Sequence, residues 1–106
     1  MTTSYNTLGS ESRAWKSIRA INFRPANGSG SARAFCDVRL ETDTGGITAH
    51  GLTVIQQNGK PPWVAFPQKP GKKQGKWFPV FEADGELHSL IIAAVLDAFA
   101  AWSKGQ

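Results

Sequence analysis

Five lysines between residues 60 and 81 are the side chains of this sequence best suited to a charged partner. The stretch contains no acidic residue, and aromatic side chains lie among the lysines. The lysines are Lys60, Lys69, Lys72, Lys73 and Lys76, and the aromatic residues are Trp63, Phe66, Trp77, Phe78 and Phe81. Because ammonium groups neutralise phosphates and aromatic rings stack on bases, this pattern predicts contact with nucleic acid.

The remainder of the chain has a different charge balance. Residues 1–59 carry six basic and four acidic side chains, and residues 82–106 carry one basic and four acidic side chains. The lysine-rich stretch is therefore the strongly positive part of a chain whose net charge is +4. A surface of one sign orients a charged partner, which favours binding. We expect Arg24, Arg33 and Arg39 either to extend this basic surface or to form the polar face of a sheet.

Catalytic and metal-binding motifs are not assembled by the sequence. The segment 71–76 resembles a phosphate-binding loop, but it is one residue short, and Trp77 replaces the hydroxyl residue that holds magnesium. His88 and Ser89 are helix neighbours that point in different directions, so they form no nucleophile–base pair. His50, His88 and Cys36 lack the spacing of metal ligands. We therefore expect no enzyme activity, no metal and no cofactor.

Length and composition indicate one folded domain. The 106 residues are 41% hydrophobic, and we see no apolar run long enough to cross a bilayer and no signal-like start. The lone Cys36 cannot form an internal disulfide, which fits a reducing cytoplasm. We expect residues 1–12 to be a flexible N-terminal arm, residues 13–104 to form a single domain, and the protein to be cytoplasmic.

Periodicity predicts an α+β fold. Alternating apolar residues predict a half-buried strand over 32–41, and further strands are expected over 15–24, 47–56, 63–67 and 76–81. Asn58 and Gly59 predict a tight turn, and 68–75 is expected to be an exposed loop. An apolar stripe after Asp84, the expected N-cap, predicts a helix that ends near Lys104. The expected architecture is an antiparallel meander of four to five strands with one C-terminal amphipathic helix packed on one face.

Strand parity also predicts which side chains are buried. Cys36 is expected to be a small core residue, and His50, which shares the parity of Leu52, is expected to be a core or interface histidine. In the last strand Trp77 and Phe81 are expected on one face, with Phe78 and Val80 on the other. One of these two sets is expected to pack under the helix. Since a single helix covers a single face, an exposed aromatic face is also expected.

Several segments resemble the stage V sporulation protein G (SpoVG) family. They are His50–Ile55, Trp63–Lys69, Phe78–Val80 and Ile92–Leu96, within a similarity that runs from about residue 32 to residue 102. The resemblance implies a small α+β protein that dimerises and binds DNA, or in some members RNA, as a regulator without a cofactor.

The resemblance also assigns one site residue. It makes Lys69 the basic residue of the loop that follows Pro67. Pro70 stands where the family tends to have an arginine, and the helix entrance 82–86 is acidic where the family is basic. These differences place the expected nucleic-acid contact in the loop and not at the helix.

The sequence therefore predicts a regulatory nucleic-acid-binding protein that is a homodimer and has no membrane contact. Lys69, Lys72, Lys73 and Lys76 are expected to neutralise phosphates, helped by Lys60, while Trp77 or Trp63 stacks on a base. Single-stranded nucleic acid is as plausible as duplex, because no recognition helix is evident. The alternative is a protein-interaction module that uses an exposed aromatic sheet face and a free edge, without nucleic acid.

Overall fold

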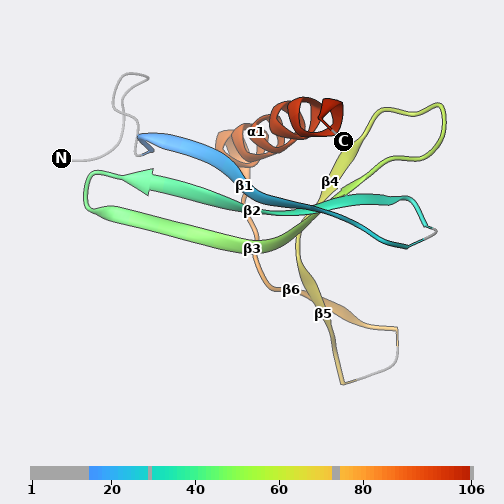
Figure 1. The fold of residues 1–106 in the computed structure, drawn as a ribbon. Helices are drawn as coiled ribbons and strands as arrows, with labels where there is room; N and C mark the ends of the chain where they lie inside the picture. The colour runs from blue at the N-terminus through green and yellow to red at the C-terminus, as the bar shows by residue number, and fades with distance from the viewer. Residues whose placement is uncertain (1–14, 29, 73–74, 106) are drawn as a thin grey trace.

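The protein has an α+β fold in which one helix covers one face of an antiparallel sheet (Figure 1). The computed structural model describes residues 15–28, 30–72 and 75–105. The predicted fold class is thus confirmed, with one difference: a second, two-stranded sheet stands apart from the first. The predicted N-terminal arm, residues 1–12, lies outside the described residues.

In the part of the chain that the structure describes, six strands precede the helix. The first sheet has the order β1-β2-β3-β4, and each neighbouring pair is antiparallel. Its strands are β1 (Ser17–Pro25), β2 (Ala32–Thr42), β3 (Gly45–Ile55) and β4 (Trp63–Ala65). The second sheet pairs β5 (Gln68–Pro70) with β6 (Trp77–Pro79), and α1 (Gly85–Lys104) follows.

The core lies between β2, β3 and the helix. The alternation predicted for β2 is confirmed, because Ala34, Cys36, Val38 and Leu40 are all buried on the side of the helix. Cys36 has no exposed surface, as expected of a small core residue. Burial of such apolar side chains is the main stabilising contribution to a domain of this size.

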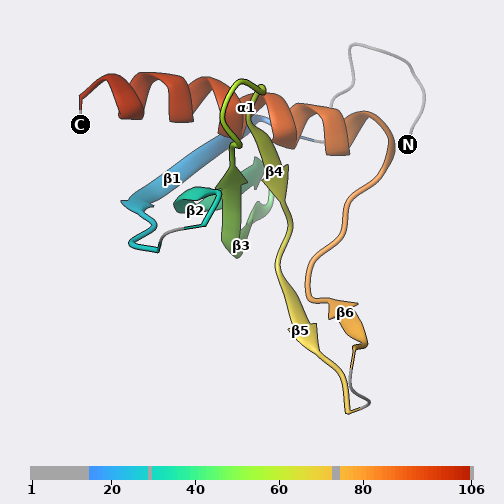
Figure 2. The same cartoon turned by 90° about the vertical axis from the view of Figure 1, so that its right-hand side faces the viewer.

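Helix α1 contributes an apolar stripe to this core. Ile91 and Val95 are fully buried. Asp84 is the N-cap residue as predicted, although its side chain makes no capping hydrogen bond. By length and composition alone α1 could also span a membrane, which the sequence analysis did not expect. A helix that covers a protein core meets the same criterion, and this one lies on the four-stranded sheet (Figure 2).

The chain reverses between β3 and β4 at the predicted turn. Gly59 has a φ of 77°, and the Lys60 amide donates to the Gln57 carbonyl at 3.1 Å. Positive φ is readily adopted by glycine, which explains why Asn58-Gly59 is a turn signal. The turn is part of a longer connection, since β3 ends at Ile55 and β4 begins at Trp63.

The β5–β6 hairpin leaves the body of the molecule. It extends to the side of the four-stranded sheet opposite α1 (Figures 1 and 2), and neither of its strands packs against another described strand or the helix. Residues 68–70, expected to be loop, form a strand, and the strand expected over 76–81 is only Trp77–Pro79. The prediction failed here because Gln-Lys-Pro has no apolar alternation that would mark a strand.

Candidate nucleic-acid interface

Backbone pairing places the lysines of the hairpin around one aromatic ring. Lys69 lies opposite Phe78, and Pro70 lies opposite Trp77. The Gly71 amide donates to the Lys76 carbonyl at 2.8 Å, which closes the hairpin at its tip. Residues directly opposite each other on antiparallel strands share a face. The Lys69 side chain and the Phe78 ring therefore lie on one face of the hairpin.

A groove follows from this arrangement. Its volume is about 770 Å³, and it is lined by Lys69, Pro70, Gly71, Lys72, Lys76 and Phe78. The Phe78 ring packs so closely over Gly71 that a Cβ at this glycine would clash with it. The groove thus combines three ammonium groups with one aromatic ring, the side chains that hold a phosphate and a stacked base.

Most of the predicted phosphate contacts meet in this hairpin. Lys69, Lys72 and Lys76 line the groove, whereas Lys73 lies outside the described residues. None of the ion pairs found among the described residues involves a lysine of the groove. Their charges are therefore not neutralised by a carboxylate in this part of the chain.

The prediction that one aromatic set of the last strand packs under the helix is wrong. Trp77, Phe78 and Val80 are 61%, 52% and 61% exposed, because the hairpin stands away from the core. Phe81 alone of the two sets packs against the core, where its ring lies 5.6 Å from that of Phe66. Sequence reasoning named Trp77 as a stacking residue and missed Phe78. The pairing of Phe78 with Lys69 is the signal that could have identified it.

Lys60 and Trp63 are not part of the groove. They line a separate, smaller pocket of about 290 Å³ on the connection between β3 and β4. This connection extends toward the helix side of the sheet, and the hairpin extends to the other side (Figures 1 and 2). The structure therefore separates Lys60 from the lysines of the hairpin. Trp63, in β4, pairs with Ile55 and lies on the face opposite to the buried Val64, so its side chain points away from the core.

The three predicted arginines belong to the four-stranded sheet. By register, Arg24 and Arg39 lie on the face opposite α1, which we call the open face. Arg39 is held by Glu41 at 2.9 Å and by the Thr48 hydroxyl at 3.0 Å. Arg33 sits at a β-bulge and donates its Nε to the Gln56 carbonyl at 3.1 Å. Arg24 and Arg39 thus belong to the polar face of the sheet, one of the two alternatives expected for them; that they extend the basic surface stays a prediction.

The centre of the open face carries a buried carboxylate, Asp37, which the sequence analysis did not single out. Only 5% of this residue is exposed. Both strands beside it contain an irregularity at this level, in β1 between Ile21 and Arg24 and in β3 opposite the step from Cys36 to Val38. Asn22 and Gly51 supply the positive φ angles of 59° and 84° at these two sites. Bulges change the direction of nearby side chains and backbone groups. Here the two bulges direct the Asn22 side chain and the Gly51 amide at Asp37.

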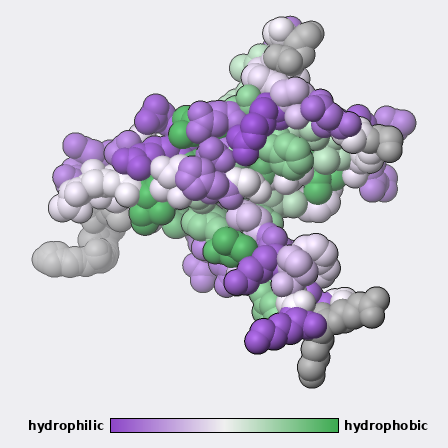
Figure 3. All heavy atoms as spheres, turned by 60° about the horizontal axis from the view of Figure 1, so that its bottom comes forward, coloured by the Kyte–Doolittle hydropathy of each residue, from purple (hydrophilic) through white to green (hydrophobic). Residues whose placement is uncertain are grey.

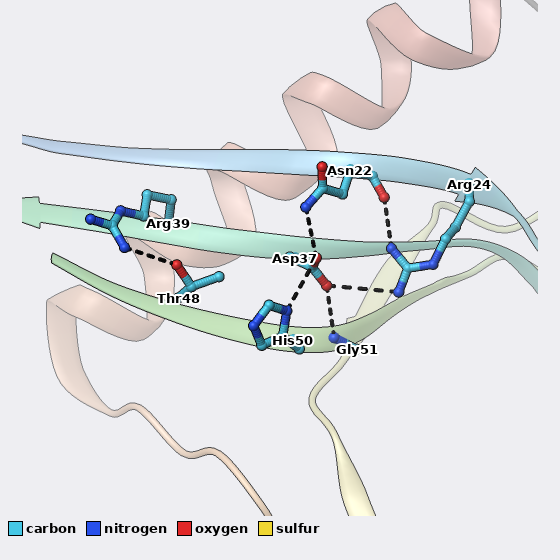
Figure 4. Close-up of polar contacts among 7 residues, drawn as sticks. All are labelled: Asn22, Arg24, Asp37, Arg39, Thr48, His50 and Gly51. Carbon is cyan, nitrogen blue, oxygen red and sulfur yellow. Dashed lines mark hydrogen bonds and ion pairs between the residues drawn. The ribbon is translucent and has the colours of Figure 1, made fainter.

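Four groups converge on the Asp37 carboxylate (Figure 4). The Asn22 amide and the His50 Nδ1 lie 2.9 Å and 3.2 Å from Oδ2. The Gly51 amide and an Arg24 guanidinium nitrogen lie 3.1 Å and 3.7 Å from Oδ1. Burial raises the pKa of Asp37, but hydrogen bonds from Asn22, Gly51 and His50 outweigh burial and hold that pKa below its ordinary value. Asp37 is thus an ionised, satisfied charge under the open face.

The bulge in β3 also explains why His50 is not a core residue, which was one of the two alternatives expected for it; the interface alternative stays a prediction. His50 was expected to share the face of Leu52, but Leu52 is buried in the core and His50 is exposed beside Asp37. One extra residue in a strand interrupts the alternation of its side chains. Every side chain before the extra residue therefore lies on the face opposite to the one that strict alternation would assign. Alternation alone therefore assigns the wrong face to His50.

Cys36, the neighbour of Asp37 in β2, faces the core. Burial and, to a smaller extent, the charge of Asp37 raise the pKa of this thiol to about 11, with Arg24 opposing the shift. A neutral, buried thiol is a poor nucleophile and a poor metal ligand. Among the residues that the structure describes, no three His, Cys, Asp or Glu side chains gather as metal ligands would.

A pocket of about 580 Å³ lies at the base of the hairpin, next to the start of α1. Its polar lining includes Glu82, Asp84 and His88. Two carboxylates do not suit a phosphate, so this pocket does not favour a phosphate contact at the helix entrance. A scan against models of protein families and a search of curated proteins both find no match to this chain.

Proposed function

We propose that this protein binds nucleic acid through the β5–β6 hairpin, as a cytoplasmic regulatory protein without a cofactor. The resemblance to the SpoVG family points to the same function. Lys69, Lys72 and Lys76 neutralise phosphates, and Phe78 supplies a ring on which a base stacks. Trp77, exposed beside Phe78, offers a second ring.

The groove of the hairpin is the observation that carries this proposal. Three lysines without an ion-pair partner among the described residues surround an exposed ring in a hairpin that packs on no other described element. An aromatic side chain that contributes nothing to the core costs solubility, so its exposure indicates a binding role. Clustered like charges also repel one another, and an anion in the groove relieves that repulsion.

A protein-interaction module is the second candidate function. Phe78 and Val80 on one face of the hairpin and Trp77 on the other are exposed apolar side chains, which also suit a second protein chain. The resemblance to the SpoVG family also implies a homodimer. Size-exclusion chromatography with light scattering measures the oligomeric state. In this second function the lysines serve solubility, and binding of nucleic acid is absent.

Fluorescence anisotropy with labelled DNA and RNA, each single-stranded and duplex, tests the proposal. We expect affinity to fall as salt rises, with a slope of log K against log salt of about −0.7 for each phosphate neutralised on a single strand. Replacing Lys72 or Lys76 with Gln removes one such contact. Each variant is therefore expected to bind more weakly and to reduce the slope by about that amount.

Lys104→Gln is the matched control, because it removes the same charge at the far end of α1. It is expected to leave both the affinity and the slope nearly unchanged. If Lys104→Gln and Lys76→Gln reduce the affinity and the slope equally, binding depends on the overall charge of the protein and not on a site in the hairpin. A complete lack of binding at low salt would overturn the proposal in favour of the protein-interaction module.

A further inference from the structure

The open face presents a basic and an aromatic side chain next to each other. Arg24 in β1 is the cross-strand partner of Phe35 in β2, and both are exposed. Cross-strand partners share a face and have their Cβ atoms about 5 Å apart. The Arg24 and Phe35 side chains therefore start from neighbouring positions on the same face, which α1 leaves uncovered.

The Asp37 cluster fixes the Arg24 guanidinium in place. One terminal nitrogen donates to the Asn22 carbonyl at 2.8 Å, and the other lies 3.7 Å from the Asp37 carboxylate. A guanidinium has five N–H donors, so others remain for a ligand. His50 is held by the same carboxylate through Nδ1, and its second ring nitrogen, which bonds no other described residue, can bond a ligand.

We propose that Arg24, His50 and Phe35 form a nucleotide subsite for single-stranded nucleic acid, with Asp37 as its positioning residue. Arg24 contacts a phosphate, Phe35 stacks on a base, and His50 bonds the sugar or base beside them. The subsite rests on the proposed function of the hairpin and deepens it by naming the ligand as an unpaired strand. In a duplex the bases stack on each other and offer no free face to Phe35.

The position of the hairpin supports a common ligand for both surfaces. The hairpin projects on the side of the sheet opposite α1, which is the side of the open face (Figures 2 and 3). That face shows apolar areas among hydrophilic side chains (Figure 3). One strand of nucleic acid can therefore pass from the lysine groove onto the sheet. Aromatic residues on an uncovered antiparallel sheet are a common platform for single strands.

Charge favours nucleic acid over a second copy of this chain on the open face. In a two-fold dimer the same patch meets itself, so like charges come together. The described part of this face carries Arg19, Arg24 and Arg39 with only Asp37 and Glu41 as acids, and Arg33 lies at its bulge. A phosphate backbone complements this excess of positive charge, and a second open face does not.

A pair of matched variants tests the subsite. Arg24→Gln and Arg19→Gln each remove one arginine of 49% and 59% side-chain exposure from the same strand and the same face. Arg19 lies away from Phe35, near Glu41. For a labelled oligothymidylate of about twelve nucleotides we expect Arg24→Gln to weaken binding about tenfold and Arg19→Gln less than about twofold. Thermal melting checks that both variants are folded.

Phe35→Leu provides a second test that keeps an apolar side chain at the position. We expect it to weaken binding of the single strand about tenfold and to leave binding of a duplex of the same length unchanged. A photoactivatable base in the oligonucleotide is expected to cross-link to the peptide that contains Phe35. Equal losses for Arg24→Gln and Arg19→Gln, or equal losses of single strand and duplex for Phe35→Leu, would overturn the subsite.

The hairpin variants separate this result from a failure of the proposed function. If Lys76→Gln weakens binding while Arg24→Gln and Phe35→Leu do not, the hairpin binds nucleic acid and the subsite is wrong. If Arg24→Gln and Phe35→Leu weaken binding while Lys76→Gln does not, the sheet is the site and the hairpin proposal is wrong. Dissociation of a dimer by Phe35→Leu, with unchanged binding, would assign the open face to a second copy and overturn the subsite.

Discussion

Among single residues, Asp37 carries the clearest consequence for stability. Its folded-state pKa lies below the ordinary value of 3.8, so the unfolded chain binds this proton first as the pH falls. The stabilisation is complete above the ordinary pKa and is lost as the pH falls through the lower, folded-state pKa. Asp37→Asn removes the charge and is expected to lower the free energy of unfolding at neutral pH by about 1–3 kcal/mol.

Chemical denaturation of the wild type and of Asp37→Asn, at pH 7 and in acid, measures this effect. The difference in free energy of unfolding between the two proteins is expected to shrink in acid. Protonation makes the wild-type Asp37 side chain neutral there, as the asparagine already is. Asp43→Asn is the control, because this acid is exposed and its ion pair is with the exposed Lys16. If the difference in free energy of unfolding between the wild type and Asp37→Asn stays constant with pH, the folded-state pKa of Asp37 is not below its ordinary value.

At the scale of elements, the hairpin depends on a contact between a glycine and a ring. A Cβ at Gly71 clashes with Phe78, so Gly71→Ala forces the ring to move and changes the shape of the groove. We expect weaker binding of single-stranded nucleic acid, by several-fold, because stacking contributes about 1–3 kcal/mol per base. The free energy of unfolding is expected to change little, since the hairpin strands pack on no other described element.

Titration of Gly71→Ala with the labelled strand, together with thermal melting, checks this expectation. Gly30→Ala is the matched control, because a Cβ at Gly30 meets no atom within 4 Å. A large fall in the melting temperature of Gly71→Ala would mean that the hairpin supports the core. Unchanged binding by a folded Gly71→Ala variant would remove Phe78 from the interface.

Some elements were predictable from the sequence because one physical signal dominated them. The β2 alternation and the apolar stripe of α1 both reflect burial on one face, and the turn at Asn58 and Gly59 reflects the positive φ of Gly59. The face of His50 was not predictable, since a bulge shifts parity without a mark in the apolar pattern. The groove was only partly predictable: its lysines are evident, but aromatic residues such as Phe78 are usually in the core.

For the whole molecule, the hairpin is an appendage whose two ends meet. The Val80 amide donates to the Pro67 carbonyl at 2.9 Å, so a two-residue turn can join these positions. We expect replacement of 68–79 by Asn-Gly to preserve the four-stranded sheet and α1. The shortened protein is expected to melt near the wild-type temperature and to lose most of its salt-dependent binding, because the groove lysines are gone.

Circular dichroism and the anisotropy titration measure these two properties of the shortened protein. The full chain with Lys72→Gln is the comparison, because it keeps the hairpin and loses one charge. An unfolded shortened protein would show that the hairpin contributes to the fold. A folded shortened protein with full affinity would move the whole nucleic-acid site to the sheet.

The two bulges beside Asp37 also determine where this chain tolerates a change of length. Each bulge exists because β1 and β3 carry one residue more than β2 at that level. Deleting one residue there returns the strand to regular pairing with the same partners on both sides, but it removes the backbone conformation that directs the Asn22 side chain or the Gly51 amide at Asp37, which leaves the buried carboxylate with fewer donors. Homologous chains are therefore expected to conserve the spacing around Asn22 and Gly51 strictly, while insertions and deletions accumulate in the β5–β6 hairpin.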